Sequence, residues 1–67
     1  MTAPVRWIIW VNGYGAFHFD GTEQKAEGRR GAKACWEGGI GRKWRIGADG
    51  KPEPDKMGRL PTEEQMP

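Results

Sequence analysis

The chain has 67 residues, 30% of them charged, with a formal net charge of +2, and this length allows one domain with a small core. Its one cysteine excludes an internal disulfide framework, and one cysteine with one histidine cannot form the usual four-ligand zinc site. Because no stretch approaches the roughly 18 consecutive apolar residues of a membrane helix and the N-terminus lacks a signal-peptide pattern, we expect a cytoplasmic protein.

The first predicted element is a β-hairpin over residues 5–19. Its residues are largely β-branched or aromatic, as strands prefer. Asn12-Gly13 is the favoured pair for a two-residue type I′ turn. We therefore predict strands over residues 5–11 and 14–19, with Val11 opposite Tyr14. A four-residue loop would leave the same side chains on each face, and only an odd loop length with a bulge would change them.

Strand alternation then assigns the hairpin side chains to two faces. One face would carry Trp7, Ile9, Val11, Tyr14, Ala16 and His18. The other face would carry Arg6, Ile8, Trp10, Gly15, Phe17 and Phe19. Both sets are largely apolar, although one face of an antiparallel hairpin is normally polar because it meets water.

A helix should follow the hairpin. Asp20 can cap it, with Glu23 placed as in a capping box. We expect the helix to reach about Glu37 and to end at Gly38-Gly39. Small residues recur at helical spacing within it, which predicts a stripe that packs closely on large sheet side chains such as Trp10 and Phe17. The stripe is Gly28, Gly31, Ala32 and Cys35.

Residues 42–47 alternate strictly and predict a third strand, with Trp44 and Ile46 on one side and Lys43 and Arg45 on the other. A right-handed crossover through the helix would place this strand beside the first. The predicted fold is therefore a small α+β domain, β-β-α-β, over residues 1–48. Its three-stranded antiparallel sheet has the order 2-1-3, and the helix covers one face. Residues 49–67 contain four of the five prolines and predict an extended or disordered tail.

Catalytic chemistry finds little support in the sequence. His18 and Cys35 could form a base and nucleophile, but a core thiol and a strand histidine are the more frequent explanation of such a pair. The glycine-rich segment at residues 38–43 lacks the spacing of a phosphate-binding loop. We predict that the protein is not an enzyme and has no cofactor or metal.

The predicted uncovered sheet face is the candidate binding surface. It would join aromatic and basic side chains, namely Trp7, Tyr14, His18, Lys43 and Arg45. A second basic cluster lies on the predicted helix, at Arg29, Arg30 and Lys33. Trp, Tyr and Arg concentrate binding energy at protein interfaces, whereas aromatic and basic groups together also suit single-stranded nucleic acid. Alternatively, the tail could fold back and cover this face with Met57 and Leu60.

In its small size, single compact unit and lack of catalytic residues, the chain resembles the small accessory proteins of bacteriophages and mobile elements, including anti-CRISPR inhibitors. This resemblance implies a binding protein that occupies a surface of a larger protein or protein complex. The other hypotheses are a single-stranded nucleic-acid-binding module that uses the same face and a homodimer through that face.

Overall fold

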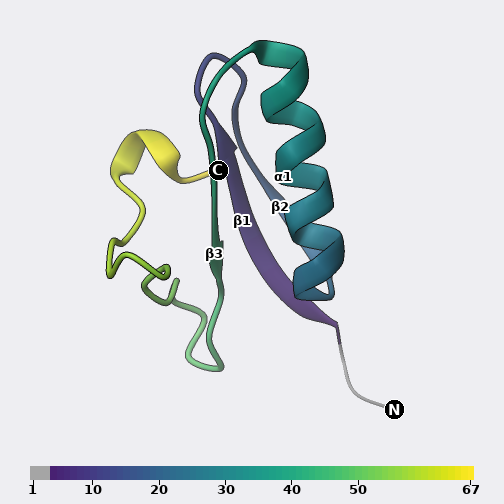
Figure 1. Cartoon of the computed structure of the whole chain (residues 1–67). Helices are drawn as coiled ribbons and strands as arrows, with labels where there is room; N and C mark the ends of the chain where they lie inside the picture. The colour runs from purple at the N-terminus through teal and green to yellow at the C-terminus, as the bar shows by residue number, and fades with distance from the viewer. Residues whose placement is uncertain (1–3) are drawn as a thin grey trace.

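The computed structural model describes residues 4–67. Strands β1 (Val5–Val11) and β2 (Gly15–Gly21) are followed by helix α1 (Glu23–Glu37), strand β3 (Gly41–Arg45) and the short 3-10 helix η1 (Glu63–Gln65) (Figure 1). Both β2 and β3 pair antiparallel with β1, so the three-stranded sheet has the order β2-β1-β3. The predicted α+β fold and strand order are confirmed.

The hairpin loop is one residue longer than we predicted. Val11 pairs with Gly15 rather than with Tyr14, and the Tyr14 N–H donates to the Val11 carbonyl at 3.0 Å. A type I′ turn requires Asn12 to have a positive φ, but the positive φ values lie at Gly13 and Gly15. Asn12 instead donates its N–H to the Ile40 carbonyl at 2.9 Å, which extends the pairing of β1 with the β3 side.

This odd loop length corrects the predicted faces, because it shifts β2 by one residue against β1. Trp7 lies opposite Phe19, and Ile9 lies opposite Phe17. These side chains form the core with Ala26 of α1. Helix α1 therefore covers the face that carries Trp7, which we had predicted to be uncovered.

Helix α1 begins two residues later than expected. Thr22 is the N-cap, and its hydroxyl accepts the Lys25 N–H at 3.2 Å. The predicted cap, Asp20, is still part of β2 and forms an ion pair with Arg6 at 2.9 Å. The predicted end is confirmed, since Gly38 caps the helix in the left-handed conformation with φ 64°.

The side of α1 that faces the sheet differs from the predicted one. Ala26 is fully buried, whereas Gly28, Gly31, Ala32 and Cys35 are exposed. The predicted packing of this small-residue stripe on the sheet is therefore wrong. With Ala26 buried, Glu27 and Arg30 on the neighbouring flank of the helix bond to each other and to β3. The small-residue stripe then faces outward.

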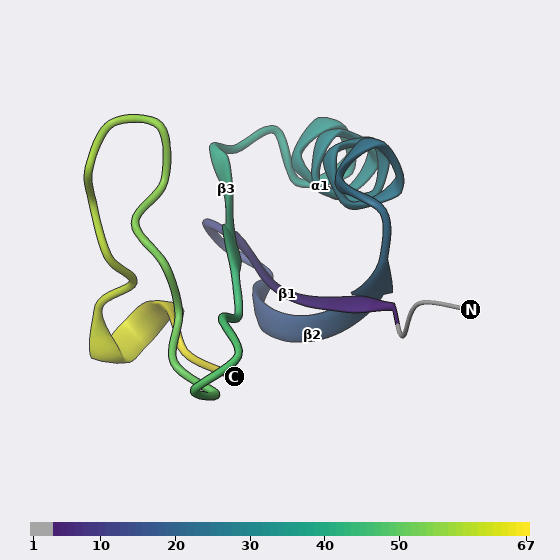
Figure 2. The ribbon, with the colours of Figure 1, turned by 90° about the horizontal axis from the view of Figure 1, so that it is seen from below.

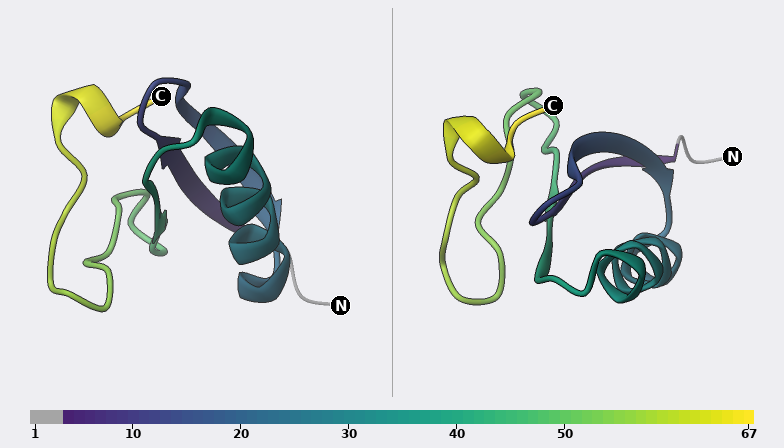
Figure 3. Two further views of the ribbon diagram at one scale, coloured as in Figure 1. Left: turned by 45° about the horizontal axis from the view of Figure 1, so that its top comes forward. Right: turned by 90° about the horizontal axis from the view of Figure 1, so that it is seen from above.

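The tail after β3 lies on the side of the sheet opposite α1 (Figure 2). It turns back at Gly47, whose N–H donates to the Lys51 carbonyl at 2.8 Å, and Glu53 donates its N–H to the Arg45 carbonyl at 2.7 Å. Further along, the Trp44 indole N–H donates to the Arg59 carbonyl at 2.9 Å. The tail then reaches η1, which returns toward β2 (Figure 3).

The second sheet face is therefore covered too. Ile8 lies opposite Trp44 on this face, and their exposed fractions are 0% and 1%. The tail folds back onto the sheet, but on the face that carries Ile8 and Trp44 rather than on the Trp7 face that the alternative had it cover. The predicted covering side chains, Met57 and Leu60, are nevertheless 74% and 56% exposed, so the backbone around Arg59 supplies the contact with Trp44.

Candidate partner-binding site

Three of the predicted site residues lie together, but on the face that α1 covers. Trp7 pairs with Arg45 across the strands and is only 6% exposed. The Lys43 ammonium lies 5.6 Å from the centre of a Trp7 ring and bonds to the helix through Glu27 at 3.3 Å. Trp7 and Lys43 stabilise the packing of α1 on the sheet, whereas Arg45 is exposed and pairs with Glu53 of the tail. The three residues therefore do not form the open surface that we predicted.

Of two further predicted residues, His18 is separated from that group, whereas Arg30 shares the Glu27 carboxylate with Lys43. His18 is exposed on the opposite face, where it pairs with Ile8. Arg30 is held inside the fold because its guanidinium bonds to Glu27 and donates to the Gly41 carbonyl at 2.9 Å. This carbonyl belongs to the first residue of β3, so Arg30 fixes the helix to the edge of the sheet.

The remaining predicted residues, Tyr14, Arg29 and Lys33, come together on the β2 side of α1. The Lys33 ammonium lies 4.6 Å from the Tyr14 ring centre. Arg29, one helical turn earlier, has its guanidinium carbon 5.3 Å from the Phe19 ring centre. Tyr14 also meets Phe17 edge-to-face, with the ring centres 6.0 Å apart. Cations and aromatic rings thus alternate along the boundary between α1 and β2.

Trp36 extends this arrangement along the helix. It follows Lys33 by three residues and Arg29 by seven, a spacing that places all three on one helix flank. Its side chain is 87% exposed, the largest value among the exposed large apolar residues of the described chain. We call the combined surface the aromatic–cationic strip. Its members are Tyr14, Phe17, Phe19, Arg29, Lys33 and Trp36.

The opposite flank of α1 has a different electrostatic character. Glu27 bonds to Arg30 and to Lys43, and Lys43 also approaches Glu23 at 3.8 Å. Hydrogen bonding from Arg30, followed by the charge of Arg30 and then by hydrogen bonding and attraction from Lys43, holds the pKa of the Glu27 carboxyl below its usual value. The charges on this flank compensate one another, whereas Arg29 and Lys33 have no ion pair with any of residues 4–67.

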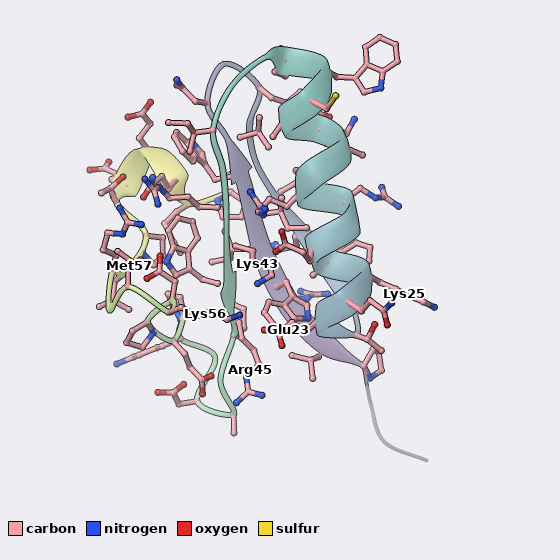
Figure 4. All side chains as sticks on the ribbon, viewed as in Figure 1. Glu23, Lys25, Lys43, Arg45, Lys56 and Met57 are labelled. Carbon is pink, nitrogen blue, oxygen red and sulfur yellow. The ribbon has the colours of Figure 1, made fainter. Side chains whose placement is uncertain are left out.

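A hollow lies between α1, β3 and the tail. Its lining includes Lys43, Arg45, Lys56 and Glu23 (Figure 4). A further acidic group, Asp55, also lines it. Arg45 is itself paired with Glu53 at 2.9 Å. Because charges of both signs line this hollow and most of them are paired, it offers no excess charge to hold an anion or a cation.

Within residues 4–67, His18 and Cys35 are not brought together. Cys35 is exposed on α1, which corrects the predicted core position, and His18 lies on the sheet face away from the helix. The described residues also contain no group of three or more His, Cys, Asp or Glu side chains placed to hold a metal ion. None of the helices among these residues is long and apolar enough to cross a membrane.

The strip contains a residue that our sequence reasoning missed. Trp36 continues the helical spacing of Arg29 and Lys33, and that periodicity could have identified it. We assigned no role to Trp36 because we expected the small-residue stripe to determine which way the helix faces. Phe17 and Phe19 were correctly placed beneath the helix, but they also extend to its β2 edge, where they are partly exposed.

Comparison of the chain with protein-family models, with curated proteins and with solved structures found no match.

Proposed function

We propose that the protein is a small non-enzymatic binding protein that acts by protein–protein contact through the aromatic–cationic strip. The observation that carries this proposal is the 87% exposure of Trp36 on the same helix flank as Arg29 and Lys33. Leaving an indole in water forgoes about 1.5–3 kcal/mol of burial free energy, by analogy with other large apolar side chains. An exposed group of this kind is typical of interface centres.

The composition of the strip favours a protein partner. Trp, Tyr and Arg are the residue types enriched among side chains that dominate interface energetics. The contacts of Tyr14 with Lys33 and Phe17 hold its ring in place, so little side-chain entropy is lost on binding. The unpaired charges of Arg29 and Lys33 suit a partner with acidic groups around an apolar centre.

This chemistry is compatible with a role in occupying a surface of a larger protein or protein complex. An inhibitor of a host complex, of the kind that bacteriophages and mobile elements encode, would use such a surface. A cytoplasmic location is part of the proposal, because the exposed thiol of Cys35 suits a reducing compartment.

A single-stranded nucleic-acid-binding module is the second candidate, and the bare indole beside two cations favours it. Bases stack on aromatic rings with about 1–3 kcal/mol each, and lysine and arginine neutralise phosphates. However, Lys33 and Arg29 already lie over the rings of Tyr14 and Phe19. Because these cations cover the rings, the strip offers Trp36 rather than a series of open stacking surfaces.

Capture of partners from the source-cell lysate with variants of the immobilised protein tests the leading proposal. Lys33→Glu reverses a charge inside the strip. Lys51→Glu is the matched control, because it makes the same charge change on an exposed residue in the tail turn. We expect a protein that the wild type and Lys51→Glu recover and that Lys33→Glu loses. Equal recovery by all three proteins would contradict the assignment of the strip.

Titration with a single-stranded oligonucleotide distinguishes the second candidate. Tryptophan fluorescence should not respond if the partner is a protein. Quenching that weakens steeply with added salt and disappears in Trp36→Phe would instead support nucleic-acid binding, because phosphate contacts release counterions.

A further inference from the structure

The two edges of the sheet differ in how their backbone groups are satisfied. Strands β2 and β3 are both edge strands. The Ile46 N–H bonds to the Arg6 carbonyl, so alternation directs the backbone groups of Gly41, Lys43 and Arg45 outward. The Gly41 carbonyl accepts from the Arg30 guanidinium, and the Arg45 carbonyl accepts from Glu53. The β3 edge is therefore capped at both ends.

The β2 edge has no such caps. Since Arg6 directs its carbonyl toward β3, its neighbour Trp7 directs its backbone groups toward Phe19 of β2. The N–H and C=O groups of Ala16, His18 and Asp20 consequently point away from the sheet. These backbone groups make no hydrogen bond to any other backbone group within residues 4–67. An uncapped edge is a template for another strand.

The β2 edge is also self-complementary. When a second β2 pairs antiparallel with His18 opposite His18, Ala16 lies opposite Asp20 on both sides of the two-fold axis. Every outward N–H and C=O of these residues is then paired. Centring the axis on Phe17 or Phe19 instead leaves one of the outward residues without a partner.

The side chains agree with this register. The pairing places Phe17 of one copy opposite Phe19 of the other on the helix-covered face, and both rings are only partly buried in the single chain. Cross-strand aromatic pairs contribute roughly 0.2–1 kcal/mol each. No like-charged residues lie directly opposite each other, because Asp20 faces Ala16.

We propose that two copies of this chain associate by antiparallel pairing of their β2 edges around His18, which forms a continuous six-stranded sheet. Two copies of the three-stranded sheet join without any change in β1 or β3. The two aromatic–cationic strips then lie on the same side of the joined sheet.

Charge placed at residue 18 tests the register directly. His18→Lys and His18→Glu each put like charges opposite each other across the two-fold axis, which destabilises the pairing. By sedimentation equilibrium we expect the wild type to reach twice its 7.5 kDa chain mass as its concentration rises, and each variant alone to stay monomeric. An equimolar mixture of the two variants should regain the dimer mass, because opposite charges then face each other. Circular dichroism spectra of both variants that match the wild-type spectrum show that the variants remain folded.

Three results would overturn the proposal. They are a wild type that stays monomeric up to its solubility limit, single variants that remain dimeric, and a mixture that fails to associate.

His18→Pro supplies an independent test, since the His18 N–H points outward and its loss removes a dimer hydrogen bond without removing one from the β1–β2 ladder. His18→Val keeps the N–H and should keep the dimer. The strip variant Lys33→Glu leaves the β2 edge intact, so failure of partner binding and failure of the dimer are separable.

Discussion

The Lys33 ammonium lies 4.6 Å from the centre of the Tyr14 ring, which joins the third turn of α1 to the loop of the β1–β2 hairpin. Tyr14 is 50% exposed, so the contact lies at the protein surface while it orients an aromatic side chain. One lysine thus fixes the helix relative to the hairpin and contributes charge to the proposed binding strip.

A double-mutant cycle should detect this contact. We expect Lys33→Gln and Tyr14→Leu to be less destabilising together than the sum of the single changes, with a coupling of about 0.5–1 kcal/mol, the usual range for an exposed cation–π pair. The free energy of unfolding in urea measures it. A cycle between Lys33 and Met57, which lies in the tail, is the control. Equal coupling in the two cycles would contradict a specific Lys33–Tyr14 interaction.

Two glycines of the helix segment should respond to alanine in opposite directions. Gly28 lies inside α1, and a Cβ there meets nothing within 4 Å. Gly28→Ala should therefore stabilise the protein by about 1 kcal/mol through helix propensity. Gly38 has φ 64°, and Gly38→Ala should cost about 1 kcal/mol because alanine is strained in that conformation. Thermal unfolding followed by circular dichroism checks both signs.

The indole hydrogen bond from Trp44 should hold the tail against the sheet. Trp44→Phe keeps most of the apolar contact but leaves the Arg59 carbonyl without its donor. We expect a loss of about 1–2 kcal/mol and faster amide exchange in residues 53–66. Trp36→Phe is the matched control, because Trp36 is 87% exposed and should not change stability measurably. Unchanged tail exchange in Trp44→Phe would contradict the role of this bond.

Acid should weaken the link between α1 and β3 through Glu27. The folded protein holds the pKa of Glu27 below its ordinary value, first through hydrogen bonding from Arg30. The resulting stability is present above the unfolded-state pKa and is lost as the pH falls through the folded-state pKa. Because the carboxyl is 48% exposed, solvent screening limits the effect to about 0.5 kcal/mol.

Glu27→Gln should accordingly lower stability at neutral pH and give a flatter decline on acidification, so that the two stability curves converge at low pH. Urea unfolding across a pH series measures this difference. Glu37→Gln, at the exposed end of α1, serves as the control and should follow the wild type. A parallel offset between Glu27→Gln and wild type at all pH values would exclude the titration of Glu27 as the cause.

The sequence was sufficient to predict the three strands, helix α1 and the sheet order, but not η1. The β-branched and aromatic run, the Gly38 helix end and the alternation around Trp44 are local signals, and each led to the observed element. The grouping of Lys43 and Arg45 with Trp7 was also correct. Handedness of the crossover then determined the strand order.

The faces could not be predicted because one residue of loop length reverses them. Asn12-Gly13 favours a two-residue turn, but the Asn12 N–H bonds to the Ile40 carbonyl, Asn12 lacks the positive φ that this turn requires, and the turn extends to Tyr14. That contact joins residues far apart in the sequence. The outward direction of the stripe at Gly28 and Gly31 has a similar origin, since it depends on the bonding of Arg30 to Gly41.

The central claim is that the aromatic–cationic strip binds a protein partner, and the affinity of Trp36→Ala for the captured partner tests it most directly. Met57→Ala is the control, because Met57 is 74% exposed but lies in the tail. By isothermal titration calorimetry we expect Trp36→Ala to weaken binding at least tenfold, a loss of about 1.4 kcal/mol, and Met57→Ala to leave it unchanged. Equal affinities of Trp36→Ala and wild type, with both proteins folded, would contradict the account.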